Sequence, residues 1–185
     1  MFLFPCCFAL RLLYMRSCYR EYRDASGKIY AADSLLGELE RDRKQNKTIV
    51  FTNGCFDVLH RGHVEYLQFC RRQGDVVVVG LNSDRSVKTI KGPDRPINGQ
   101  QDRAAILAAL EAVDYVTIFD EPTPLNLIMK VRPDVLVKGE DWAQKGVVGR
   151  EFVESYGGKV ALAPLVSGRS STSTIEKIHS LEVES

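Results

Sequence analysis

Two of the three histidines of this 185-residue chain stand three positions apart in the stretch TNGCFDVLHRGHVEYL, residues 52–67. His60 and His63 flank an Arg-Gly pair just after an apolar, β-branched run, and Gly62 lets the chain turn into a helix. A helix start presents free backbone N–H groups and the positive end of its dipole, so it is a natural phosphate site. Two imidazoles beside it add donors that can follow negative charge onto a phosphate. The pattern predicts phosphate chemistry.

Metal ligation and simple capping are the alternatives for this histidine pair. A zinc site needs a third and a fourth ligand, but His179 lies in the expected last helix and no cysteine pair stands nearby. Capping and packing would explain a single histidine at a helix start. Two histidines that flank a glycine after a buried strand favour a functional role.

A second polar stretch, NSDRSVKTIKGPDRPING at residues 82–99, is long enough to act as a lid. Lys88 and Lys91 can neutralise a triphosphate, and Arg95 can hold a further phosphate with its forked guanidinium. Arg103 in the next expected helix can reach the same pocket, although a surface position explains it equally well. A charge-rich run is often only a solvated face. Its place between a strand and a helix favours ligand binding.

A third stretch, SGRSSTSTIEKI, places hydroxyl residues at 170–174 before the last expected helix. One or two hydroxyl side chains are ordinary helix caps, but five in a row exceed what capping requires. Together with free N–H groups they predict a second phosphate cradle. The chain has no GxxxxGK[ST] sequence, no GxGxxG after the first strand and no GxSxG elbow. These absences disfavour a P-loop protein, a dinucleotide-binding enzyme and a serine hydrolase.

The elements that position these residues alternate between strands and helices. Strands are expected over residues 48–54, 75–84, 114–119, 134–139 and 159–165. Helices are expected over residues 32–47, 62–74, 98–113, 123–133 and 173–181. The alternation indicates a single-domain α/β fold, a Rossmann-like parallel five-stranded sheet with helices on both faces.

Ligands of such sheets bind beyond the carboxyl ends of the strands. That rule selects four loops, at residues 52–63, 82–98, 138–141 and 164–174. All the unusual polar stretches of the chain fall in these loops.

Composition limits the class of protein. With 25 Lys plus Arg against 24 Asp plus Glu, the chain does not suggest a nucleic-acid or membrane binder. Its apolar fraction of 44% is that of a soluble globular protein. The cysteines are odd in number, five, and show no metal spacing, so we expect reduced thiols in a cytoplasmic protein.

The apolar start of the chain, MFLFPCCFAL, is interrupted at Arg11 and Arg16. It is shorter than a membrane span of about 20 residues. Its charges follow the apolar run, and no small-residue cleavage site comes after it, unlike a secretory signal. A reverse-oriented anchor stays open. We interpret residues 1–27 as a tail, disordered or ahead of the true start, and residues 28–185 as the domain.

With its HxGH core and its hydroxyl-rich last helix start, the sequence resembles the cytidylyltransferase-like nucleotidylyltransferases. LNSDRSVKTIKGPDRPIN, DRAAILAALEAVDYV, PDVLVKGEDW and SSTSTIEKI add a closer resemblance, to bacterial D-glycero-β-D-manno-heptose 1-phosphate adenylyltransferases. The similarity runs over about residues 28–181. HxGH alone would indicate only the superfamily, whereas the lid and VKGEDW segments indicate the subfamily.

This resemblance implies transfer of AMP from ATP to the heptose 1-phosphate, giving ADP-heptose and pyrophosphate by direct in-line attack. Such a reaction serves lipopolysaccharide or surface-layer sugar assembly. It implies Mg²⁺ as cofactor, bound mainly by phosphate oxygens and water, with any direct protein ligand left open. It also leaves a homodimer open. The family is frequently fused behind a sugar kinase, which this chain lacks, so we expect a separate kinase to supply the substrate.

Two other functions stay open. Superfamily motifs also permit a cytidylyltransferase that acts on glycerol 3-phosphate or phosphoethanolamine, although the lid sequence speaks against it. The other is a non-catalytic nucleotide-binding module, which loss of a motif histidine or a lid lysine would favour. The chain retains these residues.

The resemblance assigns the catalytic roles to the histidine loop and the lid. His60 and His63 would contact the ATP phosphates and stabilise the transition state. Lys91 would hold the α-phosphate, with Lys88 as a helper. Asp57 and Arg95 are candidates for the sugar phosphate.

The remaining assigned residues concern the nucleotide. The pocket itself would be shaped by the backbone of Thr52, Asn53, Gly54 and Phe56. The outer phosphates would be held by Arg103, Ser170, Ser171 and Thr172. The base and ribose would be bordered by Gly139, Glu140 and Asp141. Cys55 is the only obvious nucleophile in the histidine loop, and it is better explained as a small buried residue, so we expect no covalent intermediate.

Overall fold

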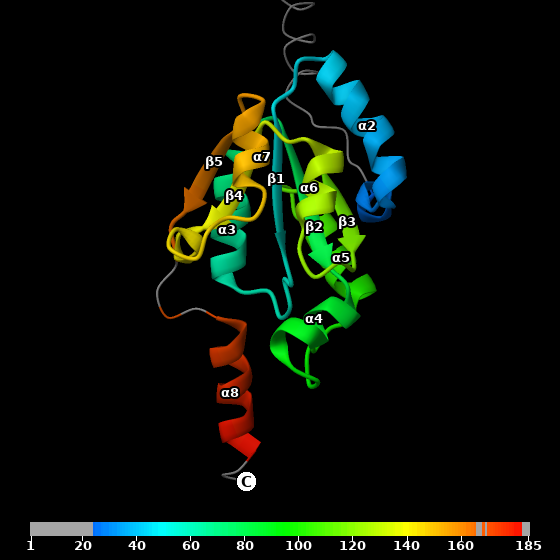
Figure 1. The fold of residues 1–185 in the computed structure, drawn as a ribbon. Coiled ribbons are helices and arrows are strands. Elements are labelled where there is room, and N and C mark those ends of the chain that lie inside the picture. Colours follow the sequence, from blue (N-terminus) through cyan, green and yellow to red (C-terminus); the bar gives the residue numbers. More distant parts are fainter. Residues whose placement is uncertain (1–23, 166–167, 169, 183–185) are drawn as a thin grey trace, which may run out of the picture.

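A five-stranded parallel sheet forms the centre of the protein (Figure 1). The structure, a computed structural model, describes residues 24–165, 168 and 170–182. The sheet has the order β3-β2-β1-β4-β5. Its strands are β1 (Ile49–Gly54), β2 (Val76–Asn82), β3 (Tyr115–Phe119), β4 (Val135–Gly139) and β5 (Lys159–Ala163). The predicted Rossmann-like parallel sheet is confirmed.

Helices lie on both faces of this sheet (Figure 1). The α-helices are α2 (Ala32–Lys44), α3 (Arg61–Arg71), α4 (Asp84–Lys91), α5 (Gln100–Ala109), α6 (Leu125–Val131), α7 (Arg150–Ser155) and α8 (Ser171–Glu182). Two short 3-10 helices are η1 (Ala25–Lys28) and η2 (Glu140–Trp142). Within the described residues, no helix has both the length and the apolar character that crossing a bilayer requires.

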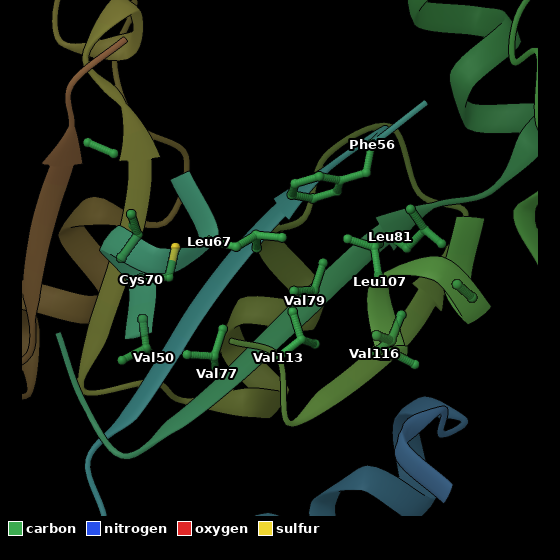
Figure 2. Close-up of a cluster of buried hydrophobic side chains, with 14 of the residues drawn as sticks. Val50, Phe56, Leu67, Cys70, Val77, Val79, Leu81, Leu107, Val113 and Val116 are labelled. Atoms are coloured by element: carbon green, nitrogen blue, oxygen red, sulfur yellow. The ribbon is translucent and has the colours of Figure 1, made fainter. Parts of the chain in front are cut away.

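Strand residues point alternately to two apolar layers, as the period of two in a strand requires. Val77, Val79 and Leu81 of β2 pack with α3 and α5 in one layer, shown in Figure 2. Val76 and Val78 of the same strand pack with α2, α6 and α7 in the other layer. Every residue of β2 is buried, which explains why its sequence is a continuous apolar run.

The strand order reverses direction between β1 and β4. From β1 the chain builds outward through β2 and β3, then crosses to the other side of β1 for β4 and β5. Both β1–β2 and β1–β4 pairs are parallel, so the carboxyl ends of β1 and β4 open side by side. A doubly wound sheet has its crevice at this switch point, which is where a ligand is expected.

Several boundaries differ from those expected from the sequence. The lid is not an open loop, because residues 84–91 form α4, capped by the Ser83 hydroxyl, which accepts from the N–H of Ser86. Helix α7 and the turn η2 were not expected. Helix α3 begins at Arg61, one residue before the expected start, with His60 as its cap.

The first and last elements of the described chain also differ from the predicted boundaries. Helix α8 starts two residues earlier than predicted, at Ser171. Most of the predicted tail, residues 1–23, lies outside the described residues. Residues 25–28 form η1, and the ammonium of Lys28 donates to the carbonyls of Leu110 and Val113. The part of the fold that the structure describes therefore includes a few residues before residue 28.

Candidate active site

A cavity of about 700 Å³ opens at the carboxyl ends of β1 and β4, at the switch point of the sheet. Its lining comes from the β1–α3 loop, the lid, the β3–α6 loop, the end of β4 with η2, and the start of α8. All four loops expected from the sequence thus meet in one pocket, each with at least one of its predicted polar residues. The β3–α6 loop was missed because the residues that it places in the lining, Pro122, Thr123 and Pro124, are uncharged.

The start of α3 is organised by the two histidines. The Nδ1 atom of His60 accepts from the N–H of Gly62 at 3.1 Å, and the Nδ1 of His63 accepts from the N–H of His60 at 3.3 Å. This reciprocal arrangement is a capping box. An imidazole whose Nδ1 accepts must carry its proton on Nε2. The capping interpretation and the functional one therefore describe the same geometry, since both rings also line the cavity.

His63 is held in its neutral form. Burial lowers its pKa from 6.5 to about 4, helped by His60 and opposed by the carboxylate of Asp57. The two imidazoles stack with ring centroids 4.0 Å apart, and the ring of Phe56 lies 5.5 Å from that of His63. At neutral pH this side of the cavity therefore presents an uncharged N–H donor rather than an imidazolium.

The loop that carries these rings has an unusual backbone. Phe56 and Val58 adopt positive φ angles of 46° and 50°, which non-glycine residues rarely do. A side chain on Gly54 would place its Cβ only 3.1 Å from the Phe56 ring, so a glycine fits this approach. The residue between the two strained positions, Asp57, ties the loop to the lid.

Asp57 is a lid anchor rather than an open ligand. Its carboxylate is 1% exposed and accepts from Arg95 Nε at 2.8 Å, Ile97 N at 2.8 Å and Asn98 N at 3.0 Å. Burial by itself would raise its pKa, but the N–H groups of Asn98 and Ile97 and the guanidinium of Arg95 lower it overall. Its predicted contact with a sugar phosphate stays a prediction. Arg95, held by Asp57, lines the cavity.

Arg103 corrects a prediction from the sequence. It is 1% exposed and does not reach the cavity lining. Its guanidinium donates to the carbonyls of Asn98, Cys55 and Asn82 and to the carboxylate of Asp84. These groups belong to the histidine loop, the end of β2 and both ends of the lid. Arg103 therefore positions the site from behind instead of contacting outer phosphates.

The start of α8 closes another side of the cavity. Ser170 Oγ accepts from the N–H of Ser173 at 3.0 Å, which caps the helix. Ser171 Oγ donates to the carbonyl of Asp57 at 2.6 Å and so joins α8 to the histidine loop. Thr172 also lines the cavity. The predicted hydroxyl cradle thus lines the same pocket as the histidines.

The end of β4 and the turn after it contribute a cation and an aromatic ring that the sequence interpretation missed. Lys138 and Trp142 both line the cavity, together with the predicted Gly139 and Asp141. A Cβ on Gly139 would lie 2.6 Å from Asp141 Oδ1, so a glycine allows this turn. A lysine at the end of an otherwise apolar strand was the available signal for Lys138.

Most of the residues predicted to form the site meet in the cavity. From the histidine loop these are Asn53, Gly54, Phe56, Asp57, His60 and His63. From the lid, the β4 end and α8 they are Lys91, Arg95, Gly139, Asp141, Ser170, Ser171 and Thr172. The ligand contacts predicted for them stay predictions.

Three other predicted residues, besides Arg103, lie off the lining. Thr52 is fully buried, and its hydroxyl pairs with Tyr66 Oη at 2.6 Å. Lys88 is exposed on α4. Glu140 accepts from the N–H of Leu165 and so fixes the segment after β5. The structure gives these side chains structural or solvent-facing positions.

Two kinds of chemistry fit poorly here. Burial raises the pKa of the Cys55 thiol, against the lowering by Lys91, Arg103 and Arg95, so this cavity residue is a poor nucleophile. Among the described residues, no group of three His, Cys, Asp or Glu side chains could hold a metal ion. A divalent cation fits this site as one carried by ligand phosphates and water.

Comparison with known sequences agrees with this geometry. A family model described as cytidylyltransferase-like matches residues 51–177. The bifunctional protein HldE of Syntrophotalea carbinolica is 58% identical over 151 residues, 82% of this chain and 31% of that protein. HldE of Geobacter sulfurreducens is 56% identical over 158 residues, 85% of this chain and 32% of that protein. The chain spans about a third of the length of these curated relatives.

Solved structures share the fold. A lipopolysaccharide core biosynthesis protein from Thermoplasma volcanium is 27% identical, with a TM-score of 0.53 over 65% of this chain and 97% of that chain. The pantoate-beta-alanine ligase of Francisella tularensis is 19% identical, with a TM-score of 0.55 over 77% of this chain and 68% of that chain. At that identity the second similarity concerns the fold alone.

Proposed function

The chain belongs to the cytidylyltransferase-like family of nucleotidyltransferases, and from this we propose that it is a heptose 1-phosphate adenylyltransferase. It would transfer AMP from ATP to D-glycero-β-D-manno-heptose 1-phosphate and release pyrophosphate. A phosphate oxygen of the sugar attacks the α-phosphorus directly, and the bond to the departing pyrophosphate breaks. The alternative for a family member is transfer of CMP from CTP to glycerol 3-phosphate or phosphoethanolamine.

One observation carries the reaction type: the Nδ1 atoms of His60 and His63 accept backbone N–H groups at the start of α3, which leaves Nε2 as the donor position of two rings that line the cavity. The attacking sugar phosphate is already an anion at neutral pH, so the reaction requires no general base. Catalysis then consists of aligning two anions and stabilising charge on the phosphorane and the leaving group. Fixed N–H donors perform that task without a proton transfer.

The cations of the cavity suit the charge of these substrates. Lys91 and Arg95 reach it from the lid. Lys91 can neutralise the α-phosphate as a point charge, and Arg95 can present its guanidinium to a second phosphate. Mg²⁺, when bound to oxygens of the triphosphate, would offset part of its negative charge.

The choice of heptose rests on sequence. The lid and VKGEDW segments resemble the heptose subfamily, and the HldE proteins share 56–58% identity with this chain. We also propose a cytoplasmic location, where ATP is available, and a sugar kinase reaction that supplies the 1-phosphate.

The test is pyrophosphate release by the full chain with Mg²⁺. ATP or CTP is paired with β-heptose 1-phosphate or glycerol 3-phosphate in all four combinations. Release with ATP and the heptose alone is the expected result. Release with CTP and glycerol 3-phosphate would overturn the proposed substrates and leave the reaction type. Silence in all four, from folded protein that binds ATP, would contradict catalysis with these substrates.

A further inference from the structure

The lysine at the end of β4 has no role in the mechanism above. Lys138 is only 7% exposed, yet it lines the cavity. Its ammonium donates to Oδ1 of Asn53, the corresponding end of β1, and lies 5.3 Å from the centre of the Trp142 ring. Lys138 therefore bridges the two strands that flank the switch point, at the base of the crevice.

The partners of this ammonium are weak for a buried cation. An amide oxygen and an aromatic face do not cancel a positive charge, and a buried cation usually pairs with a carboxylate. Within the part of the chain that the structure describes, no ion pair of 4.0 Å or less includes Lys138. The side chain is held in place, and the carboxylate of Asp141, whose charge acts on it, does not come close enough to form an ion pair with it.

The surroundings of Lys138 set its protonation. Burial lowers its pKa from 10.5 to about 8, while Asp141 on η2 and Cys55 after β1 act in the opposite direction. Tyr66 on α3 donates to the carbonyl of the preceding Val137, and burial raises the pKa of that phenol, so it stays neutral. At pH 7 the ammonium form of Lys138 predominates, and it is lost as the pH rises through about 8.

We propose that Lys138 is a phosphate-binding residue, whose ammonium donates to a phosphate oxygen of the bound ligand at the base of the cavity. This rests on the proposed function, which brings a triphosphate and a sugar phosphate into the same pocket. A phosphate bound there would supply the ion-pair partner that Lys138 lacks among the described residues. Lys91 and Arg95 reach the same cavity from the lid, so the phosphate is enclosed by cations from two sides.

Lys138→Met tests this contact because methionine keeps most of the apolar stem and removes the charge. Lys138→Arg keeps a charge that does not titrate below about pH 12. Lys145→Met is the matched control, since Lys145 lies 5.7 Å from the same Trp142 ring but is largely exposed and outside the cavity lining. Calorimetry on the full chain measures the dissociation constants of ATP and of the sugar 1-phosphate separately, from about pH 6.5 to 9.5.

We expect Lys138→Met to weaken one of the two ligands by roughly 10- to 100-fold at pH 7, the range of a charge-assisted hydrogen bond. Loss of ATP affinity assigns the contact to the nucleotide, and loss of sugar phosphate affinity assigns it to the acceptor. In the wild type, the affinity for the ligand that Lys138 contacts should fall by up to about tenfold per pH unit above pH 8. Lys138→Arg should flatten this fall, and Lys145→Met should leave it intact.

The proposal is overturned if Lys138→Met binds both ligands within about twofold of wild type, or if Lys138→Arg keeps the wild-type fall above pH 8. A purely structural role would not respond to pH in this way, so the arginine variant decides even if the methionine variant unfolds. These measurements do not depend on turnover. An absence of pyrophosphate release would contradict the proposed function. The binding measurements would still decide whether Lys138 contacts a phosphate.

Discussion

Two helix starts contribute to the lining of the cavity, and they are built differently. Helix α3 is anchored by Leu67 and Cys70, which are fully buried in the layer shown in Figure 2. Helix α8 extends away from the sheet in Figure 1, and its Ile178 and Leu181 are 52% and 61% exposed. The hydrogen bond from Ser171 to the carbonyl of Asp57 joins the start of α8 to the histidine loop.

This difference separates two tasks. Groups that stabilise a transition state must be held to within fractions of an ångström, which requires packing behind them. The imidazoles on α3 have that support from the core, from the capping box and from Phe56. The start of α8 is joined to the histidine loop by the hydrogen bond of Ser171. This looser attachment suits groups that contact a phosphate of the bound ligand. We therefore expect α3 to govern kcat and α8 to govern affinity.

The largest effect should come from His63→Gln. Glutamine at this third helical position is the ordinary capping-box residue, so the bond to the N–H of His60 can persist. The imidazole Nε2–H is lost, and removal of one such donor lowers kcat by about 10²–10³-fold. Rates of pyrophosphate release and urea unfolding of the same sample measure both consequences. A variant with kcat within about threefold of wild type would contradict the claim that α3 governs kcat.

The next effect concerns acid stability. His63 has a pKa of about 4 in the folded protein and 6.5 as its ordinary value. Between these values the unfolded chain binds more protons, so the free energy of unfolding decreases as the pH falls from 6.5 to 4. The loss is at most about 3 kcal/mol. Urea unfolding of wild type and His63→Gln at several pH values measures it, and the variant should show a shallower decline. Parallel declines would mean that His63 is not held neutral.

An intermediate effect is expected for Asp57→Asn, at the junction of the two helix starts and the lid. The substitution removes the charge that Arg95 Nε and two backbone N–H groups share. We expect a loss of about 2 kcal/mol in stability, with KM raised more than kcat is lowered, because the lid loses its anchor. Chemical denaturation and steady-state kinetics measure these changes. Asp94→Asn, an exposed carboxylate of the same lid, is the control and should behave as wild type.

The acid limit of the Asp57 contribution follows from its lowered pKa. The stability that this carboxylate provides is complete above its unfolded pKa of about 3.9 and is lost as the pH falls further. It is therefore lost at lower pH than the contribution of His63. If Asp57→Asn changed stability at pH 7 no more than Asp94→Asn, the lid would not depend on this anchor.

The sheet and the meeting of the polar loops could be predicted from the sequence, because buried parallel strands are continuous apolar runs. DVVVV and TIVF identify β2 and β1, and the switch-point rule then places their following loops together. Helix α4 was missed, since the polar, lysine-rich lid sequence shows no wide apolar face. Of the two apolar residues of α4, Val87 is buried and Ile90 is exposed.

Lys91 and Arg95 were predicted and line the cavity, but the places of Arg103 and Lys138 could not be assigned from the sequence, for a different reason. Arg103 and Arg95 are both basic residues near the lid, yet Arg103 is buried among three carbonyls and the Asp84 carboxylate, whereas Arg95 lines the cavity. Lys138 is the reverse case, a lysine in an apolar strand whose burial gives it a place in the pocket. Which carbonyls converge on a cation is a property of loops that approach from distant parts of the chain, and no local pattern records it.

The smallest effect is expected for Ser171→Ala, and it decides whether the two helix starts differ as argued. The variant loses the hydroxyl that donates to the Asp57 carbonyl, at a cost of about 1 kcal/mol. We expect KM for ATP to rise by up to about fivefold with kcat nearly unchanged, measured by steady-state pyrophosphate release. Ser180→Ala is the control, because the hydroxyl of Ser180 donates within α8 to the carbonyl of Lys177. A fall in kcat comparable to that of His63→Gln would show that α8 holds the transition state as firmly as α3, because only a group aligned with the reacting phosphorus produces that pattern.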